Sequence, residues 1–518
     1  MFAMARHLLF RNLLTGVAIL VLAAPSAAQR LAPIDLDAAL PAAEVERVLV
    51  ARAPGTPFHL RGLRDTAGAP ISLELRRLEV LTPEFQLLVD GQRADFDRES
   101  IVFLAGRVEE WQDSTAVLSL RRERGVYEGV IRHGERAYRL TGDGLGKRSL
   151  GEQLLLTELP PESLDEFQRK TDVAGEVPRP PARPGAAFTK ASAARTAVFA
   201  VDGDYEFFTI VGSEEGAVAY AGTMLAAISE VYESQVGLAI KLGTVSVWTT
   251  PDDPYTSSDN PFCEVGNFWA ANRPRQQFPR AATLMFTGKA TLFAGASALN
   301  GLCSYDHDSP LGGCVQGSYA VVNVQNNLPG ARVDTTAHEI GHMVGSVHTH
   351  CYSPPIDHCQ SGETGCYVGP KSTPEDGGSI MSYCFGSVVM SLGEPGKYGV
   401  NSERVPAVIS EFLAALDTVP VGDPDHIAAC LTGYELRATT QGTTVALHWT
   451  DNQTGEKKWW VEYRQGTTGG WKKLARPANA TAANVTKLVR SKTYQFRVRA
   501  QLKKGFSPYS ELVEVTIP

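Results

Sequence analysis

The sequence predicts a multidomain protein: a β-rich N-terminal region, a central α+β domain built on a mixed sheet, and a C-terminal all-β sandwich. Its 518 residues exceed the roughly 150 residues of one typical domain. All eight cysteines fall between Cys263 and Cys430, so one internal unit is chemically distinct. The charge also changes along the chain, from −16 over 196–430 to +8 over 431–518. A hydrophobic content of 43% excludes a largely disordered chain.

The first 28 residues have the pattern of a secretory signal peptide. Arg6 and Arg11 precede an apolar run from Leu13 to Ala24, and the small residues Ser26, Ala27 and Ala28 follow it. The apolar run is shorter than the ~20 residues that a membrane-spanning helix needs. We therefore expect a secreted protein with no membrane span, and we favour this over a membrane anchor.

Residues 29–176 form the predicted β-rich N-terminal domain, which contains no cysteine. Alternating apolar stretches typical of strands occur at Ile71–Leu75, Ala116–Leu120, Tyr127–Ile131 and Tyr138–Leu140. The Pro- and Ala-rich segment 177–195 cannot build a core, so it is predicted to be an exposed linker. Its basic residues make it either a site of proteolytic clipping or a plain spacer.

Residues 196–430 form the predicted central domain, in which strands and helices alternate. We expect strands at Ala197–Val201, Ala239–Trp248 and Ala282–Phe286, and helices at Ala217–Val231, Val333–Gly345 and after Ser402. In residues 431–518, short strand-like runs separated by turn residues predict a β-sandwich. These runs are Val445–Trp449, Trp459–Tyr463, Tyr494–Ala500 and Leu512–Ile517.

The eight cysteines behind an export signal predict disulfides, and their even number allows four. The sequence does not choose among the possible pairings. A cysteine–zinc cluster is the weaker reading, because the chain contains no pair of cysteines separated by two residues.

The motif HEIGHMVGSVH, which begins at His338, carries the strongest chemical signal. His338 and His342 are four residues apart, so they project from one helix face and can share a zinc ion. Glu339 can take a proton from a water molecule at the metal and later protonate a leaving amine. Gly345 can end the helix in a left-handed conformation, which would bring His348 back as a third ligand. A fourth position is then open, as in catalytic zinc sites.

This motif resembles the signature of the metzincin zinc metalloproteases, in which a methionine turn follows downstream. A matching segment, GSIMSYC, contains Met381. The resemblance implies that Met381 lies beneath the three zinc-bound imidazoles as an apolar base. It also implies a zincin fold with an active-site helix; Met381 as a simple core filler is the alternative.

Within this clan, the chain looks most similar to a bacterial-type adamalysin or reprolysin. Cysteines surround the motif, and the residues from Phe103-Leu104-Ala105-Gly106 to Tyr138 are similar to the prodomain pattern. Thr349 departs from the aspartate that adamalysins usually carry after the third histidine. Tyr383 is more like the astacin and serralysin turns, where such a tyrosine can stabilise the tetrahedral intermediate; a packed core tyrosine is the alternative.

The N-terminal domain resembles a propeptide of this clan, which implies a zymogen whose zinc is masked. The region has no cysteine for a thiol switch, so we expect a carboxylate or steric blockage instead. The C-terminal domain resembles a fibronectin type III domain, with Trp449 in its core and the strand from Tyr494 packed against it. Such a domain is expected to act as a spacer or to bind an extracellular surface or protein.

Other polar clusters are weaker candidates. His307, His350 and His358 could form a second metal site, although hydrogen-bonded or surface histidines are the favoured reading. Carboxylates of the acidic central domain could hold structural calcium, but no EF-hand spacing supports a particular site.

These observations predict a secreted zinc endopeptidase that acts on proteins or peptides. The alternative is a non-catalytic adhesion protein that uses the same fold as a scaffold, and a third possibility is a zinc hydrolase of non-peptide amides. The acidic central domain argues against a nucleic-acid partner, because such enzymes more often have a basic groove.

Overall fold

The computed structural model describes residues 34–37, 47–49, 57–143, 154–159 and 195–517. Its short internal gaps are 123, 257–260, 276, 292, 309–312, 326–331, 385, 418, 420–422, 428–429, 432–435, 450–455, 467–468, 502–505, 508 and 511. The predicted signal peptide (1–28) and the predicted linker (177–195), apart from Arg195, lie outside the described residues.

The central domain is built on a mixed seven-stranded sheet, as the sequence predicted. The strand order is β14-β17-β13-β11-β12-β4-β5. Its inner strands are parallel, and β14 and β5 are antiparallel to their neighbours. The strands are β4 (Leu81–Val89), β5 (Gln92–Ala94), β11 (Arg195–Gly203), β12 (Leu238–Val247), β13 (Ala282–Thr287), β14 (Gly295–Ser297) and β17 (Tyr319–Asn323).

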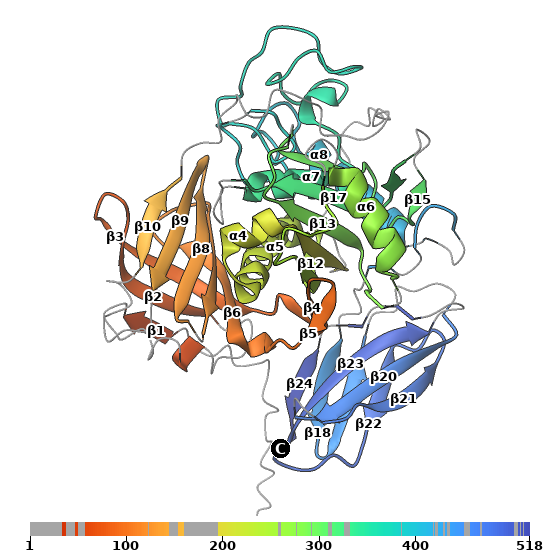
Figure 1. Cartoon of the computed structure of the whole chain (residues 1–518). Helices are drawn as coiled ribbons and strands as arrows, with labels where there is room; N and C mark the ends of the chain where they lie inside the picture. Colours follow the sequence, from red (N-terminus) through yellow and green to blue (C-terminus); the bar gives the residue numbers. More distant parts are fainter. Residues whose placement is uncertain are drawn as a thin grey trace, which may run out of the picture.

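Two strands of this sheet were not expected there. β4 and β5 precede the predicted linker, yet β4 pairs in parallel with β12. Figure 1 shows both strands in orange beside β12, away from the other N-terminal strands. The predicted domain bounds stay a prediction, but the sheet crosses the boundary between the N-terminal and central domains.

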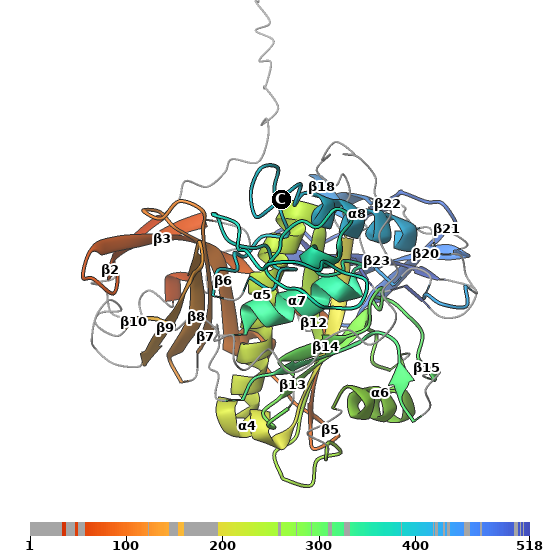
Figure 2. The ribbon, with the colours of Figure 1, turned by 90° about the horizontal axis from the view of Figure 1, so that it is seen from above.

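The helices of the central domain lie on both sides of its sheet (Figures 1 and 2). The longest helix, α5, is buried on nearly all sides, because it lies between this sheet and the N-terminal sheet. This explains its apolar sequence, since a helix enclosed on both sides needs no polar face. The helices are α4 (Tyr205–Val211), α5 (Glu214–Val236), α6 (Pro261–Asn272), α7 (Val333–Met343) and α8 (Arg404–Asp417), with the short 3-10 turn η2 at Thr349–Cys351.

The N-terminal region forms an eight-stranded sheet in the order β1-β2-β3-β6-β7-β8-β9-β10. It is antiparallel except for the β1–β2 pair. The four strands predicted here lie in β3, β7, β8 and β9. The bounds are β1 (Ile34–Asp37), β2 (Pro57–Arg64), β3 (Pro70–Leu78), η1 (Arg98–Ser100), β6 (Ile101–Val108), β7 (Ser114–Arg121), β8 (Val126–His133), β9 (Arg136–Asp143) and β10 (Leu155–Glu158).

The C-terminal domain is the expected all-β sandwich of two antiparallel sheets, ordered β18-β19-β22 and β21-β20-β23-β24. Trp449 is buried in its core, as predicted, and packs against Trp459. The strands are β18 (Arg437–Gln441), β19 (Thr444–His448), β20 (Lys458–Gln465), β21 (Lys472–Pro477), β22 (Ala482–Val485), β23 (Thr493–Gln501) and β24 (Val513–Thr516).

All eight cysteines form disulfides, which confirms the prediction of four bridges. The pairs are Cys263–Cys314, Cys303–Cys430, Cys351–Cys366 and Cys359–Cys384. Among the helices that the structure describes, none has both the length and the apolar character needed to cross a membrane.

Candidate functional site

Helix α7 carries the first part of the histidine motif. His338 and His342 lie one turn apart on its buried face, and the helix ends at Met343. Gly345 then adopts a positive φ of 100°, which turns the chain back toward the helix. This reversal places His348 beside the first two histidines, as the sequence predicted.

The three imidazoles converge on one point. His342 Nε2 lies 3.1 Å from both His338 Nε2 and His348 Nε2. Tetrahedral ligands at zinc–nitrogen distances of about 2.05 Å would be separated by about 3.3 Å. The spacing of the three nitrogens therefore fits a zinc ion, and these residues form one group that could hold a metal.

The opposite nitrogen of each ring is bonded to an acceptor that fixes the ring. His338 Nδ1 lies 2.8 Å from the carbonyl oxygen of Ile380, and His342 Nδ1 lies 2.7 Å from that of Ser346. His348 Nδ1 lies 3.0 Å from a carboxylate oxygen of Glu363. An acceptor at Nδ1 requires the proton there, so the Nε2 lone pairs are directed to the shared point.

Glu339 is positioned by the edge strand β14. Its side chain is buried, and Ser297 Oγ lies 2.7 Å from its Oε2. The carboxylate follows the first histidine on the same helix and lies against Gly295 of β14, where an added Cβ atom would be 2.2 Å from its Oε1. Each oxygen of an ionised carboxylate can accept more than one hydrogen bond, so a carboxylate bonded to a hydroxyl group can also bind a water molecule.

Met381 lies directly against helix α7 and is fully buried. A Cβ atom added at Gly341 would lie 2.1 Å from Met381 Sδ, so the thioether occupies the space that this glycine leaves. The backbone N–H of Thr349 donates to the Met381 carbonyl oxygen at 3.0 Å, and Thr349 Oγ1 donates to the same oxygen at 3.2 Å. Thr349, which departs from the adamalysin pattern, thus ties the third histidine to the methionine turn.

Tyr383 packs against the histidine rings. Its ring centroid lies 5.7 Å from that of His338 and 4.3 Å from that of His348. The structure thus brings all six residues singled out in the sequence into one cluster (His338, Glu339, His342, His348, Met381 and Tyr383).

Glu363 belongs to the same cluster but was missed in the sequence. It accepts from His348 and also from His350, whose Nε2 lies 2.8 Å from the carboxylate. Burial alone would raise the pKa of Glu363, but the hydrogen bonds from the two histidines outweigh it and lower the pKa to about 2. The Cys351–Cys366 bridge brings this loop beside His348, so knowledge of the pairing would have pointed to Glu363.

The other groups that could hold a metal are poor candidates. One contains Cys351 and another contains Cys359 and Cys384, and all three cysteines are in disulfides. A sulfur atom in a disulfide has no thiolate to offer a metal. His350 is buried and bonded to Glu363, in agreement with the favoured reading of a hydrogen-bonded histidine.

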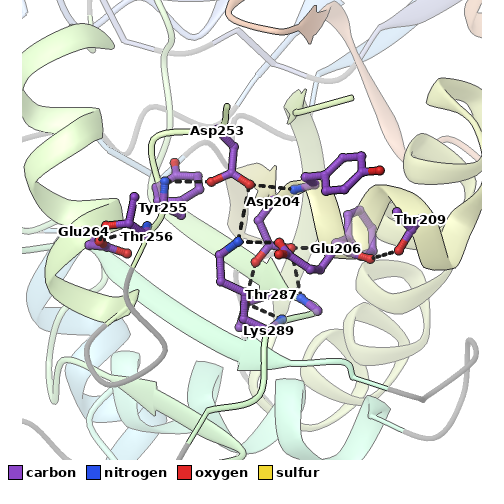
Figure 3. Close-up of polar contacts among 12 residues, drawn as sticks. Asp204, Glu206, Thr209, Asp253, Tyr255, Thr256, Glu264, Thr287 and Lys289 are labelled. Atoms are coloured by element: carbon purple, nitrogen blue, oxygen red, sulfur yellow. Dashed lines mark hydrogen bonds and ion pairs between the residues drawn. The ribbon is translucent and has the colours of Figure 1, made fainter. Parts of the chain in front are cut away.

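An acidic cluster at the start of α4 is held by donors from the protein itself (Figure 3). Asp204 accepts from the N–H groups of Phe207 and Gly288 and from Thr287 Oγ1. Asp253 accepts from the N–H groups of Tyr205 and Tyr255, and Lys289 contacts both Asp253 and Glu206. These bonds account for the buried carboxylates, so the cluster gives no support to a structural calcium site, which the sequence had left as a possibility.

Comparisons with known proteins identify two domain families in the chain. Residues 192–391 match the model of metallo-peptidase family M12, of the reprolysin type, and residues 432–516 match the fibronectin type III domain. A search of curated proteins found no match.

Several solved structures are similar to about one sixth of the chain. The C. elegans twitchin kinase region is 26% identical over 15% of this chain and 15% of the twitchin chain, with a TM-score of 0.14. The third fibronectin III domain of human KIAA0343 is 18% identical over 16% of this chain and 78% of that chain, with a TM-score of 0.15. A human collagen XX fibronectin type III domain is 16% identical over 16% and 88%, with a TM-score of 0.15.

Proposed function

We propose that this chain, which carries an M12 metallopeptidase domain followed by a fibronectin type III domain, is a secreted zinc-dependent endopeptidase of the metzincin type. The observation that carries the proposal is the convergence of three imidazole Nε2 atoms, two of them from the helix that also carries the buried Glu339. Four disulfides and the signal-like N-terminus support export.

His338, His342 and His348 would hold the zinc ion through Nε2. Their Nδ1 partners keep the rings in the required tautomer and orientation before the metal arrives. Met381 would support the rings from below, because it lies in the space left by Gly341 on the same helix. When bound, zinc acts as a Lewis acid that polarises the substrate carbonyl and lowers the pKa of a water molecule.

Glu339 is the proposed general base and acid. Its carboxylate would accept a proton from the attacking water molecule and then donate it to the nitrogen of the departing amine. Ser297 Oγ lies 2.7 Å from Oε2 and fixes the orientation of the carboxylate. Tyr383, which packs on the His338 and His348 rings, is the proposed donor to the oxyanion that forms at the substrate carbonyl.

The proposed organisation follows from these roles. Protein or peptide substrates would be cleaved by the domain at 196–430, and the type III domain at 431–518 would bind an extracellular protein or surface. The signal peptide (1–28), the N-terminal domain (29–176) and the linker (177–195) complete the proposed chain.

Glu339→Gln tests the mechanism, since the amide keeps the shape of the side chain but cannot accept the proton. We expect it to bind zinc as the wild type does and to lose at least 10²-fold of the activity on a casein substrate. The exposed Glu375→Gln in the same domain is the matched control and should retain full activity. Chelation should abolish wild-type activity, and added zinc should restore it.

The non-catalytic adhesion protein is the competing function. A wild-type protein that binds zinc at the three histidines and cleaves no protein substrate would favour it. A Glu339→Gln protein with the activity of the wild type would refute the assigned role of Glu339.

A further inference from the structure

The N-terminal sheet is apolar on both of its faces, which is unusual for an antiparallel sheet. Along β6, successive residues Val102 and Phe103 point into different cores. One face contributes to a core within the N-terminal region, through residues such as Val102, Leu104, Leu118 and Ile131. The other face contributes to the protease core, through Phe103, Ala105, Val117 and Val130. The second face would be exposed to water if the two regions separated.

Helix α5 of the protease domain is shaped to receive this face. A Cβ atom added at Gly222 would lie 2.3 Å from Phe103 Cζ, so the phenyl ring fits where the helix has no side chain. Nη2 of Arg76, in β3, donates to both carboxylate oxygens of Glu230 on the same helix, at 2.6 and 2.8 Å. The contact therefore combines apolar packing with a directional charged pair.

Strand β4 extends the protease sheet at its β12 edge. Leu87 and Val89 are paired in register with Val245 and Val247 of β12. At the end of the strand, Asp90 accepts from the backbone N–H and the hydroxyl group of Thr249, at 2.7 and 2.5 Å. Removal of β4 would expose the unpaired backbone groups of β12, which costs free energy.

Arg132 of β8 joins the N-terminal sheet to the two elements that position the proposed zinc site. Its Nη2 lies 2.9 Å from Asp334, in the first turn of α7, and 3.0 Å from the carbonyl oxygen of Val388. The backbone at Val388 is bridged to Gly378, and the segment leads to Ile380, whose carbonyl oxygen lies 2.8 Å from Nδ1 of His338. The guanidinium group therefore holds the active-site helix and the methionine-turn segment together.

The type III domain also contacts β4. Glu84 of β4 forms an ion pair with Arg497 of β23. Arg497 in turn lies over the rings of Trp471 and Tyr509, at 3.9 and 3.6 Å from their centroids. Strand β4 thus contacts both the protease sheet and the C-terminal domain (Figure 1).

We propose that the N-terminal unit, residues 57–143, remains bound as a structural part of the mature protein after any cleavage of the 177–195 linker. The sequence left open whether this propeptide-like region is removed. The sheet order places β4 and the edge strand β5 on the opposite side of the sheet from β14, whose Ser297 holds Glu339, so the addition of these two strands does not involve the β14 edge. The proposal concerns association and does not depend on the proteolytic activity.

The test uses the full chain with a recognition sequence for a specific protease inserted in the linker. After complete cleavage, verified under denaturing conditions, the sample is passed through a size-exclusion column in native buffer at micromolar concentration. We expect both fragments to co-elute at the volume of the uncleaved chain. Elution of the N-terminal fragment alone, with zinc still bound to the remaining fragment, would overturn the proposal.

Two arginine variants test whether the fragments co-elute because of the assigned interface or only because they dissociate slowly. Arg132→Ala removes a contact between the units, and Arg139→Ala removes a pair with Glu128 inside the N-terminal sheet. In a dilution series of the cleaved complex, Arg132→Ala should raise the dissociation constant roughly tenfold or more. Arg139→Ala should change it by less than about threefold. Equal effects of the two variants would contradict the assigned interface.

Discussion

Gly341 lies between the two histidines of α7, and its lack of a side chain determines how closely Met381 can approach the helix. In Gly341→Ala, the new Cβ would lie 2.1 Å from Met381 Sδ and 3.2 Å from Tyr232 Oη. Favourable contacts between non-bonded heavy atoms are about 3.5–4.0 Å. Both Met381 and Tyr232 are fully buried, so neither can move without disturbing the core.

Two effects of opposite sign set the expected change in stability. Replacing glycine by alanine in a helix interior stabilises the helix by about 1 kcal/mol. Overpacking a close-packed core costs about 1–3 kcal/mol, and this overlap lies at the upper end of that range. We expect Gly341→Ala to lower the free energy of unfolding by about 2 kcal/mol. It should also weaken zinc binding, because Met381 is displaced from its position against the helix.

A double-mutant cycle with Met381→Ala isolates the contact. Without the thioether, the alanine at position 341 meets no sulfur, so only the gain of about 1 kcal/mol in helix stability remains. The coupling free energy should therefore be about 3 kcal/mol, measured by urea unfolding of the four proteins. Zinc affinity, measured by competition with a chelator, should be lowered by Gly341→Ala when Met381 is present and should not be lowered further by it in the Met381→Ala protein. A Gly341→Ala protein as stable as the wild type, with no coupling to Met381→Ala, would refute the reasoning.

Three further predictions follow from the site and the core. Glu363→Gln should weaken zinc binding about 10- to 100-fold in the chelator competition, whereas the exposed Glu375→Gln should not; equal affinities would show that the carboxylate does not orient His348. Ser297→Ala should lower kcat about tenfold while zinc affinity is unchanged, because only the position of Glu339 is affected; an unchanged kcat would contradict this. Burial raises the pKa of Asp202 to about 6, so the folded protein retains a proton that the unfolded chain loses near pH 4. The free energy of unfolding of the wild type minus that of Asp202→Asn should therefore fall by about 2 kcal/mol between pH 4 and 6.5, and a difference that does not vary with pH would contradict this.

The arrangement of the three histidines could be predicted from the sequence, because it depends on residues that are only a few positions apart along the chain. His338 and His342 face one way on any helix, and Gly345 ends the helix wherever the chain must turn. The position of Met381 could be predicted only from the resemblance to a family, because no rule of spacing links this residue to the histidines. Glu363 required the disulfide pairing, which the sequence left open.

The positions of strands were predicted well where they depend only on the alternation of buried and exposed residues within the strand itself. The strand predictions within β7, β8 and β9 were confirmed, but the partner of β4 could not be inferred. Its pairing with β12 joins segments about 160 residues apart, and no local pattern specifies a parallel partner at that distance. A usable signal was present in β6, where the uninterrupted apolar run from Ile101 to Ala105 indicates a strand buried on both faces.

That apolar run also limits how the protein could be activated. If one face of the N-terminal sheet belongs to the protease core, release of the N-terminal unit would expose it together with the β12 edge. After cleavage of the linker, both fragments would then stay together in one complex. Any change in activity on cleavage would have to come from the freed linker itself, rather than from loss of the domain. The activity of the cleaved, co-eluting complex, compared with that of the uncleaved chain, measures this contribution directly.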